Sequence, residues 1–144
     1  MRIDGDWLPD DEGILRPLFE AQLLTASGSW IACAFLLDTG ADSTVISGEV
    51  LHKLGFPFVR AMQQLGGVGG VVETVVVATR MQMIRSDGGK VVIEGPFFAF
   101  QDETALELSV LGRDVLKHFS AIVDLPESVL HLLAGRHRYL IQEF

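Results

Sequence analysis

Residues 35–46 read Phe35-Leu36-Leu37-Asp38-Thr39-Gly40-Ala41-Asp42-Ser43-Thr44-Val45-Ile46, an apolar run that ends in an acid and a glycine. The apolar stretch Ala34 to Leu37 predicts a strand buried on both faces, so we expect the Asp38 carboxylate to emerge beside a nonpolar interior. Gly40 has no side chain, which lets the backbone turn sharply and lets another chain approach the carboxylate. Taken alone, these residues also fit an aspartate that only caps a turn, which is the commoner role of Asp-x-Gly.

A second motif lies at residues 65–71, which read Leu-Gly-Gly-Val-Gly-Gly-Val. The four glycines around Val68 predict a flexible hairpin tip, and an apolar residue there is expected to fold over a ligand and exclude water. A phosphate-binding loop is not favoured, because the last glycine of the dinucleotide fingerprint is missing. A merely flexible connection is the alternative.

The third motif is Ser-Val-Leu-Gly-Arg-Asp-Val-Leu at residues 109–116, an apolar strand that ends at Gly112 and turns into a helix. The apolar neighbours of Arg113 predict that its guanidinium is partly buried and pairs with a carboxylate. Asp42 is the candidate partner. Such a pair braces a loop without taking part in chemistry.

Composition sets the general class of the protein. A chain of 144 residues is expected to form one domain. Its 49% hydrophobic and 21% charged residues exclude wholesale disorder, and its net charge of −8 disfavours nucleic acid and anionic membranes as partners. The acidic start at residues 1–12 is unlike a secretory signal, and the apolar stretch Trp30 to Leu37 falls short of the roughly 20 residues of a membrane helix. We therefore expect a soluble, cytoplasmic protein without a membrane partner.

Neither cysteine nor histidine indicates a metal site. Cys33 is the one cysteine and lies in an apolar run, so it is expected to be a small core residue. The four histidines, His52, His118, His131 and His137, lack the ligand spacing of a zinc motif. No metal and no cofactor are expected.

Short apolar blocks between Gly, Pro and Asp predict a mainly β chain. The expected strands are Ile14–Leu24, Trp30–Leu37, Thr44–Ser47, Val71–Met83, Lys90–Phe100, Ala121–Asp124 and Val129–Leu133, with hairpin turns at 25–29 and 86–89 and short helices at Glu49–Leu54 and Arg113–Phe119. The chain is divided into an acidic N-terminal extension at 1–13, a domain at 14–133 and a C-terminal tail at 134–144 that is available to a dimer interface.

In their order along the chain, the three motifs resemble those of the retropepsin-like aspartic proteases, over about Leu15 to Leu133. The resemblance implies a mainly β, closed, barrel-like acid-protease fold with a flap hairpin and one short helix after the Gly112-Arg113 turn. Asp114 stands where retroviral enzymes usually carry Asn. The compact viral enzymes build their dimer sheet from interleaved chain ends and have no counterpart to the two terminal segments, so the mode of dimerisation here is open.

The same resemblance assigns roles to the motif residues. Asp38 would be the catalytic carboxylate, with Thr39 and Gly40 holding the loop across a dimer axis. Gly112, Arg113 and Asp114 would support that loop, with Arg113 bracing it through Asp42. The residues implied to contact substrate are Ala41, Asp42 and the flap residues Gly66, Gly67, Val68, Gly69 and Gly70.

This chemistry requires two carboxylates, one to take a proton from water and one to polarise the scissile carbonyl. The chain has one Asp-Thr-Gly, and Asp87-Gly88-Gly89 fits a hairpin turn instead. We therefore expect a homodimer that cleaves extended polypeptide segments. Ala41 offers no hydroxyl to the carboxylates, so activity is expected to extend toward neutral pH. The alternative is a catalytically inactive module of the same fold that dimerises or binds peptides.

Overall fold

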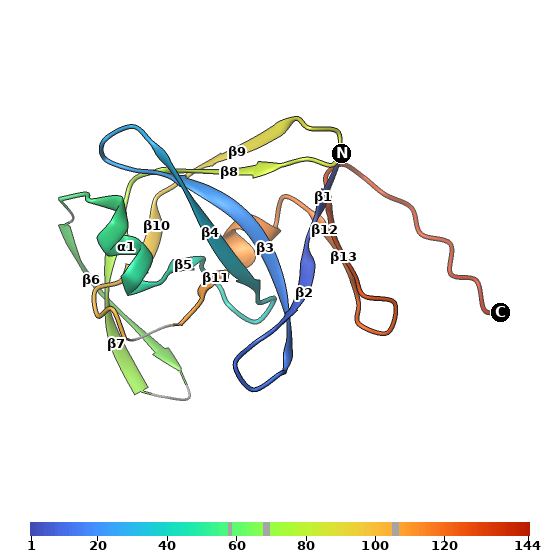
Figure 1. Cartoon of the computed structure of the whole chain (residues 1–144), viewed down its shortest axis with the longest axis horizontal. Coiled ribbons are helices and arrows are strands. Elements are labelled where there is room, and N and C mark those ends of the chain that lie inside the picture. The colour runs from blue at the N-terminus through green and yellow to red at the C-terminus, as the bar shows by residue number, and fades with distance from the viewer. Residues whose placement is uncertain (58, 68–69, 105–106) are drawn as a thin grey trace.

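The computed structural model describes residues 1–57, 59–67, 70–104 and 107–144. For residues 59–67 and 70–73 it describes the backbone only. It confirms a mainly β chain (Figure 1). Ten strands form the larger sheet: β2 (Asp6–Pro9), β3 (Leu15–Leu24), β4 (Trp30–Leu37), β5 (Val45–Ile46), β6 (Val59–Gly67), β7 (Gly70–Val77), β8 (Arg80–Ile84), β9 (Lys90–Glu94), β10 (Phe97–Phe100) and β11 (Ser109–Leu111). Their order is β6-β7-β10-β5-β11-β4-β3-β8-β9, and β2 pairs with β3.

The prediction that the barrel is closed was wrong. Across the described residues the sheet runs from β6 at one edge to β9 at the other, and these two strands do not pair. The two strands on either side of the Asp38 loop, β4 and β5, both pair with β11, which lies between them. The short helix after the Gly112-Arg113 turn is present as α2 (Arg113–Leu116).

Three strands form a second, smaller sheet in the order β1-β13-β12, with bounds β1 (Arg2–Asp4), β12 (Ser120–Asp124) and β13 (Val129–Leu133). The sequence predicts no strand before Ile14, yet β1 pairs with β13 and β2 pairs with β3. Ile3 is 1% exposed between two exposed charged residues, and the Trp7 indole donates to the carbonyl of Val129 at 3.1 Å. Residues 2–9, expected as an extension, therefore pair with the body of the protein.

Two of the expected long strands are each divided into two. Residues 71–83 form β7 and β8, separated by Ala78 and Thr79, and residues 90–100 form β9 and β10, separated by Gly95 and Pro96. The divisions occur together because the chain changes partners there: β8 pairs with β3 and β9, whereas β7 and β10 pair with each other. Gly95 N–H donates to the carbonyl of Thr79 at 2.8 Å, which holds the two breaks side by side.

The strand before Asp38 is not buried on both faces. Phe35 and Leu37 are 0% and 9% exposed, but Ala34 is exposed and Leu36 is half-buried. The expectation of burial at all four positions was wrong, because β4 presents one face to the core and alternates with period two. Only the inward residues join the hydrophobic core, which also includes Phe19 and Leu111.

The expected helix at Glu49–Leu54 is confirmed as α1 (Gly48–Leu54). Ser47 caps it by accepting a hydrogen bond from Val50 N–H at 3.4 Å, and Gly55 ends it with a φ of +69°. Among the described residues, no helix has the length and apolarity needed to cross a membrane.

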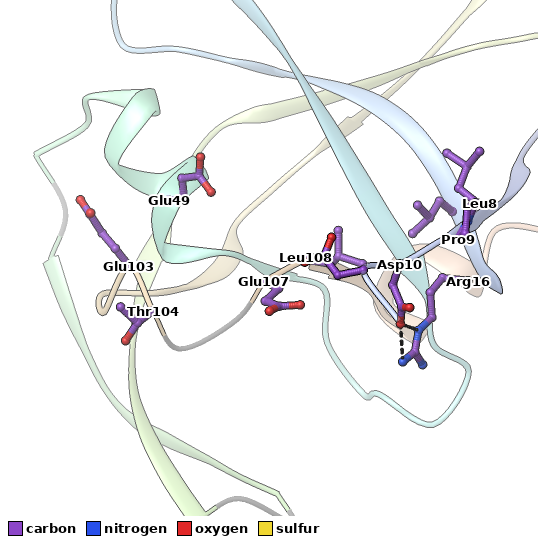
Figure 2. Close-up of a pocket in the computed structure, with 11 residues that line it drawn as sticks. Leu8, Pro9, Asp10, Arg16, Glu49, Glu103, Thr104, Glu107 and Leu108 are labelled. Atoms are coloured by element: carbon purple, nitrogen blue, oxygen red, sulfur yellow. Dashed lines mark hydrogen bonds and ion pairs between the residues drawn. The ribbon is translucent and has the colours of Figure 1, made fainter. Parts of the chain in front are cut away.

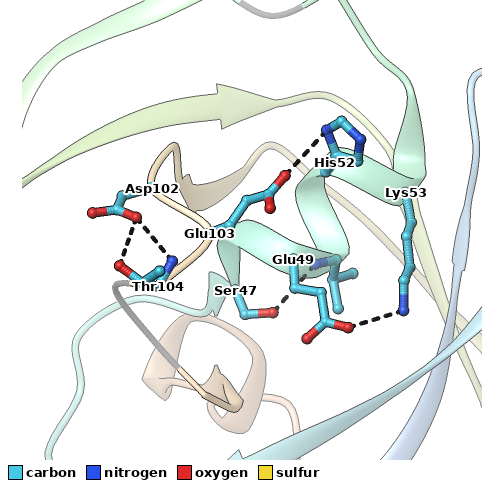
Figure 3. A network of polar contacts seen from close by, with 8 residues as sticks. Ser47, Glu49, His52, Lys53, Asp102, Glu103 and Thr104 are labelled. Atoms are coloured by element: carbon cyan, nitrogen blue, oxygen red, sulfur yellow. Dashed lines mark hydrogen bonds and ion pairs between the residues drawn. The ribbon is translucent and has the colours of Figure 1, made fainter.

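The start of helix α1 packs against the turn that contains Asp102, Glu103 and Thr104 (Figure 3). A Cβ at Gly48 would lie 2.1 Å from the carbonyl oxygen of Asp102, so only glycine allows this approach. The turn is closed by Asp102, whose carboxylate accepts from the backbone and hydroxyl of Thr104, both at 2.8 Å. The exposed pair His52 and Glu103 adds a contact at 3.4 Å. The start of α1 and this turn are therefore packed against each other.

Candidate active site

Two parallel strands place Asp38 beside the third motif. β4 and β11 pair in parallel with Leu37 opposite Leu111, so the two strands end at the same edge of the sheet. Asp38 N–H donates to the carbonyl of Leu111 at 3.2 Å. The loop after β4 and the turn after β11 therefore start side by side, although more than 70 residues separate them in the sequence.

The Asp38 carboxylate is half-buried and oriented by its own loop. The side-chain Oδ1 of Asp38 accepts a hydrogen bond from Gly40 N–H at 2.9 Å, and the backbone carbonyl of Asp38 accepts from Ala41 N–H at 3.2 Å. A Cβ at Gly40 would lie 3.2 Å from Oδ1, which is a tight approach. Among the described residues, Oδ2 of Asp38 accepts no hydrogen bond. One carboxylate oxygen is thus fixed and the other is available.

The ion pair predicted between Arg113 and Asp42 is present. Arg113 Nη1 also donates to the carbonyl of Thr39 at 2.9 Å, and Arg113 N–H donates to the carbonyl of Ala41 at 2.9 Å. The expected partial burial is wrong for the single chain, because the side chains of Arg113 and Asp42 are 54% and 85% exposed. Leu111 and Val115, the apolar neighbours of Arg113, are buried, whereas the guanidinium extends over the loop surface.

A buried hydroxyl that sequence reasoning missed ties the two loops together. Thr44 is 0% exposed, and its Oγ1 accepts from Gly112 N–H at 3.0 Å and donates to Asp114 Oδ1 at 2.7 Å. The same Asp114 oxygen accepts from the backbone N–H groups of Thr44 and Val115 at 2.8 and 2.9 Å. Only the close spelling of residues 35–46 could have signalled a role for Thr44, because its partners lie some 70 residues away.

Gly112 is required for the close approach of these loops. A Cβ at this position would lie 2.3 Å from the carbonyl carbon of Ser43 and 2.5 Å from its oxygen. Backbone atoms cannot move aside as a flexible side chain can, so a larger residue at Gly112 would push the Asp38 loop away. The third motif thus requires glycine at position 112, because a side chain there would collide with the backbone of Ser43.

The glycine motif lies at the end of the hairpin β6–β7. Gly66 is opposite Val71 and Gly67 is opposite Gly70, while Val68 and Gly69 lie outside the described residues. This hairpin extends toward the same end of the molecule as the β2–β3 turn (Figure 1). A contact of this hairpin with substrate remains a prediction.

A groove of about 580 Å³ lies between the β2–β3 turn and the loop before β11 (Figure 2). Acidic side chains and apolar side chains both line it, and Asp38 is not among them. Within it, Asp10 accepts hydrogen bonds from Ile14 N–H and from the Arg16 guanidinium, which hold the pKa of the Asp10 carboxyl below its ordinary value. The groove and the loop of Asp38 are therefore separate features of this chain.

The thiol of Cys33 is buried, as the sequence predicts. Burial raises the pKa of Cys33 to about 11, and its Sγ lies 3.3 Å from the Ser109 hydroxyl, which also accepts from Ser47 N–H at 2.9 Å. The thiol therefore stays protonated at neutral pH and packs as a core residue. Among the described residues, no group of three His, Cys, Asp or Glu side chains could hold a metal ion.

Comparison with known proteins agrees with this geometry. The family described as "Aspartyl protease" matches residues 25–115, which include the loop of Asp38 and the turn at Gly112. None of the curated protein sequences compared with the chain matches it. Among solved structures, EIAV protease complexed with the inhibitor HBY-793 is similar at 25% identity and a TM-score of 0.51, over 71% of this chain and 86% of that one.

A second similar structure is a retropepsin-like aspartic protease from Rickettsia conorii, with a TM-score of 0.54 and 18% identity. The match covers 92% of this chain and 88% of that chain, so it reaches beyond residues 25–115 to the terminal segments. At that identity the likeness shows the fold alone. Both structures support the retropepsin-like architecture that the three motifs imply.

Proposed function

Because the chain belongs to the aspartyl protease family, we propose that it is an aspartic endopeptidase whose active site forms between two copies of the chain. Each copy would supply one Asp38. The observation that carries the proposal is the loop geometry: Asp38 is fixed through one oxygen by Gly40 N–H, and its other oxygen accepts nothing among the described residues. That arrangement suits a carboxylate that must exchange a proton.

Two copies are required because the chain offers one carboxylate in this setting. Asp87, the acid of Asp87-Gly88-Gly89, accepts from Gly89 N–H at 2.9 Å and closes the β8–β9 turn. In an isologous dimer, the same loop appears on both sides of the two-fold axis and brings the two Asp38 side chains together. Two carboxylates about 3 Å apart do not both ionise easily, so the pair would share one proton.

The shared proton defines the reaction steps. The ionised carboxylate takes a proton from water, and the resulting hydroxyl attacks the scissile carbonyl while the protonated carboxyl donates to the carbonyl oxygen. When the tetrahedral intermediate collapses, the C–N bond breaks and the departing amine receives a proton from one carboxyl, while a hydroxyl of the intermediate returns its proton to the other carboxylate and becomes the carbonyl of the product acid. Water is consumed and both carboxyl groups return to their starting state, so no cofactor is needed.

We expect the substrate to be an extended polypeptide segment lying between the two loops and the two β6–β7 hairpins. Thr39 and Gly40 would hold the loops at the axis. Ala41, Asp42 and Gly66 to Gly70 would lie along the substrate main chain, with Val68 closing over it to exclude water. Action in the cytoplasm remains a prediction from the sequence.

The proposal is tested with a diverse peptide library from about pH 4 to pH 7, with cleavage read by mass spectrometry. Asp38→Asn removes the proton exchange and is expected to lower the cleavage rate by at least about 10²–10⁴-fold. Asp87→Asn is the matched control, since it alters an aspartate in a turn away from the loop. Cleavage that survives Asp38→Asn, or an inactive wild-type dimer, would contradict the proposal and favour a peptide-binding module.

A further inference from the structure

Strand β12 exposes apolar side chains at the edge of the smaller sheet. β13 lies on one of its sides, and the described part of the chain places no strand on the other. Ile122 and Val123 of β12 are 38% and 52% exposed, and Leu125 in the turn that follows is 47% exposed. An unpaired edge strand with apolar side chains is a template for pairing with another chain, which monomeric proteins usually avoid.

On the side of this sheet that faces the core, the side chains of β12 are exposed, whereas those of β13 are buried. Val123 is opposite Leu130 and Ala121 is opposite Leu132, so these four side chains share one face. Leu130 and Leu132 are both 0% exposed, whereas Val123 on the same face is 52% exposed. The hydrophobic face of the sheet therefore extends beyond the chain's own core, and a further strand beside β12 would place its side chains against Val123 on that face.

The other edge of the smaller sheet is already closed. At β1 the carbonyl of Arg2 accepts from Ser86 N–H at 2.8 Å, and the Arg2 side chain pairs with Asp4 at 2.7 Å. Backbone capping and charged side chains are two ways in which edge strands are protected. β12 is therefore the edge of this sheet that is free to accept a partner.

The edges of the larger sheet cannot serve the proposed site. Three strand intervals separate β4, which carries Asp38, from the edge strand β9. Pairing of two β9 strands would place the two β4 strands seven intervals apart, roughly 34 Å measured along the sheet at 4.8 Å per interval. The β6 edge is five intervals from β4 and would separate them further. By contrast, β12 begins at Ser120, seven residues after the Arg113 that contacts the Asp38 loop.

We propose that β12 pairs antiparallel with β12 of a second copy, with Ile122 opposite the partner's Ile122, and that this forms the dimer. The inference rests on the proposed function, since the Asp38 site is incomplete without a second copy. Each chain would contribute β1, β13 and β12 to one continuous six-stranded sheet, with no exchange of chain ends.

This register is chemically self-complementary. It places Ala121 opposite the partner's Val123, so a small and a larger apolar side chain meet on the uncovered face. It places Ser120 opposite the partner's Asp124, so that a hydroxyl faces a carboxylate and like charges do not meet.

The first test is the oligomeric state by sedimentation at a series of concentrations. Val123→Asp would place a charge against the partner's Ala121 in the proposed interface, and we expect the dimer dissociation constant to rise by at least about 30-fold. Val92→Asp is the matched control, because Val92 on the edge strand β9 is also 52% exposed. Equal dissociation constants for the two variants would overturn the proposal.

The second test is register-specific and does not depend on destabilising the chain. Residues directly opposite in an antiparallel pair have Cα atoms about 4.5–5.5 Å apart, which a disulfide can span. Under mild oxidation Ile122→Cys should give a covalent dimer that retains peptidase activity, whereas Val92→Cys should stay monomeric on a non-reducing gel. A dimer that cleaves peptides but does not cross-link through Cys at position 122 would overturn this interface and leave the proposed function intact. A protein that is active as a monomer would overturn both.

Discussion

The guanidinium of Arg113 contacts both Asp42 and Thr39: Nη2 pairs with the Asp42 carboxylate, and Nη1 donates to the Thr39 carbonyl at 2.9 Å. The arginine therefore holds both the side chain and the main chain of the Asp38 loop. Because both charged side chains are largely exposed in the single chain, their pairing contributes more to the position of the loop than to the stability of the fold.

Arg113→Ala should separate these two effects. We expect the free energy of unfolding to fall by less than about 1 kcal/mol, as for exposed ion pairs. Peptidase kcat should fall by about 10²-fold, because a displaced loop misplaces the reacting carboxylate. Denaturant unfolding and peptide kinetics measure the two quantities.

The control for this prediction is Arg80→Ala. Arg80 forms a similarly exposed pair with Glu94 at 3.0 Å, away from the Asp38 loop. It should match Arg113→Ala in stability and keep wild-type kinetics. Equal kinetics for the two variants would show that the Arg113 contact does not position the loop.

Thr44→Val should destabilise the protein although it keeps the shape of the side chain. The substitution leaves Gly112 N–H buried without its acceptor and removes a donor to Asp114. We expect a loss of about 1–3 kcal/mol in the free energy of unfolding, measured by urea denaturation. Thr104→Val, in an exposed turn, should change it by less than about 0.5 kcal/mol. Similar losses for both would mean that the Thr44 hydroxyl does not tie the loops together.

Cys33 gives a prediction for alkaline pH. Burial raises the pKa of its thiol from 9.0 to about 11, so between these values the unfolded chain releases a proton that the folded chain retains. The resulting stabilisation is fully present below pH 9 and falls as pH rises toward 11, by about 2 kcal/mol. Cys33→Ala should lack this component, so the stability difference between wild type and variant should narrow by that amount. A difference that is constant from pH 8 to pH 11 would contradict the burial of the thiol.

The sequence predicted the elements whose signals are local. β13 has the expected bounds Val129–Leu133, and turns at 25–29 and 86–89 close hairpins as expected. Strand β1 was missed because it is only three residues long and one apolar residue, the buried Ile3, lies between the exposed charged residues Arg2 and Asp4. The breaks within residues 71–83 and 90–100 follow from changes of strand partner, which no local pattern contains.

The candidate site shows the same division. Asp38 and the pairing of Asp42 with Arg113 could be inferred from the residues of the first and third motifs. The exposure of that pair and the role of Thr44 could not, because both depend on how two loops about 70 residues apart meet. Sequence spacing indicates which groups are available, whereas burial and partners are set by the tertiary structure.

We propose that one active site requires Asp38 from two chains, and subunit mixing distinguishes this arrangement from a complete site in each chain. Wild-type protein at a fixed concentration is allowed to exchange with increasing Asp38→Asn protein, and peptide cleavage is measured. If mixed dimers are inactive, activity should fall with the wild-type fraction, to about one half at equal amounts and about one eleventh at tenfold excess. Activity that does not change at tenfold excess, with exchange verified by mass-labelled subunits, would show that each chain holds a complete site and would contradict the claim.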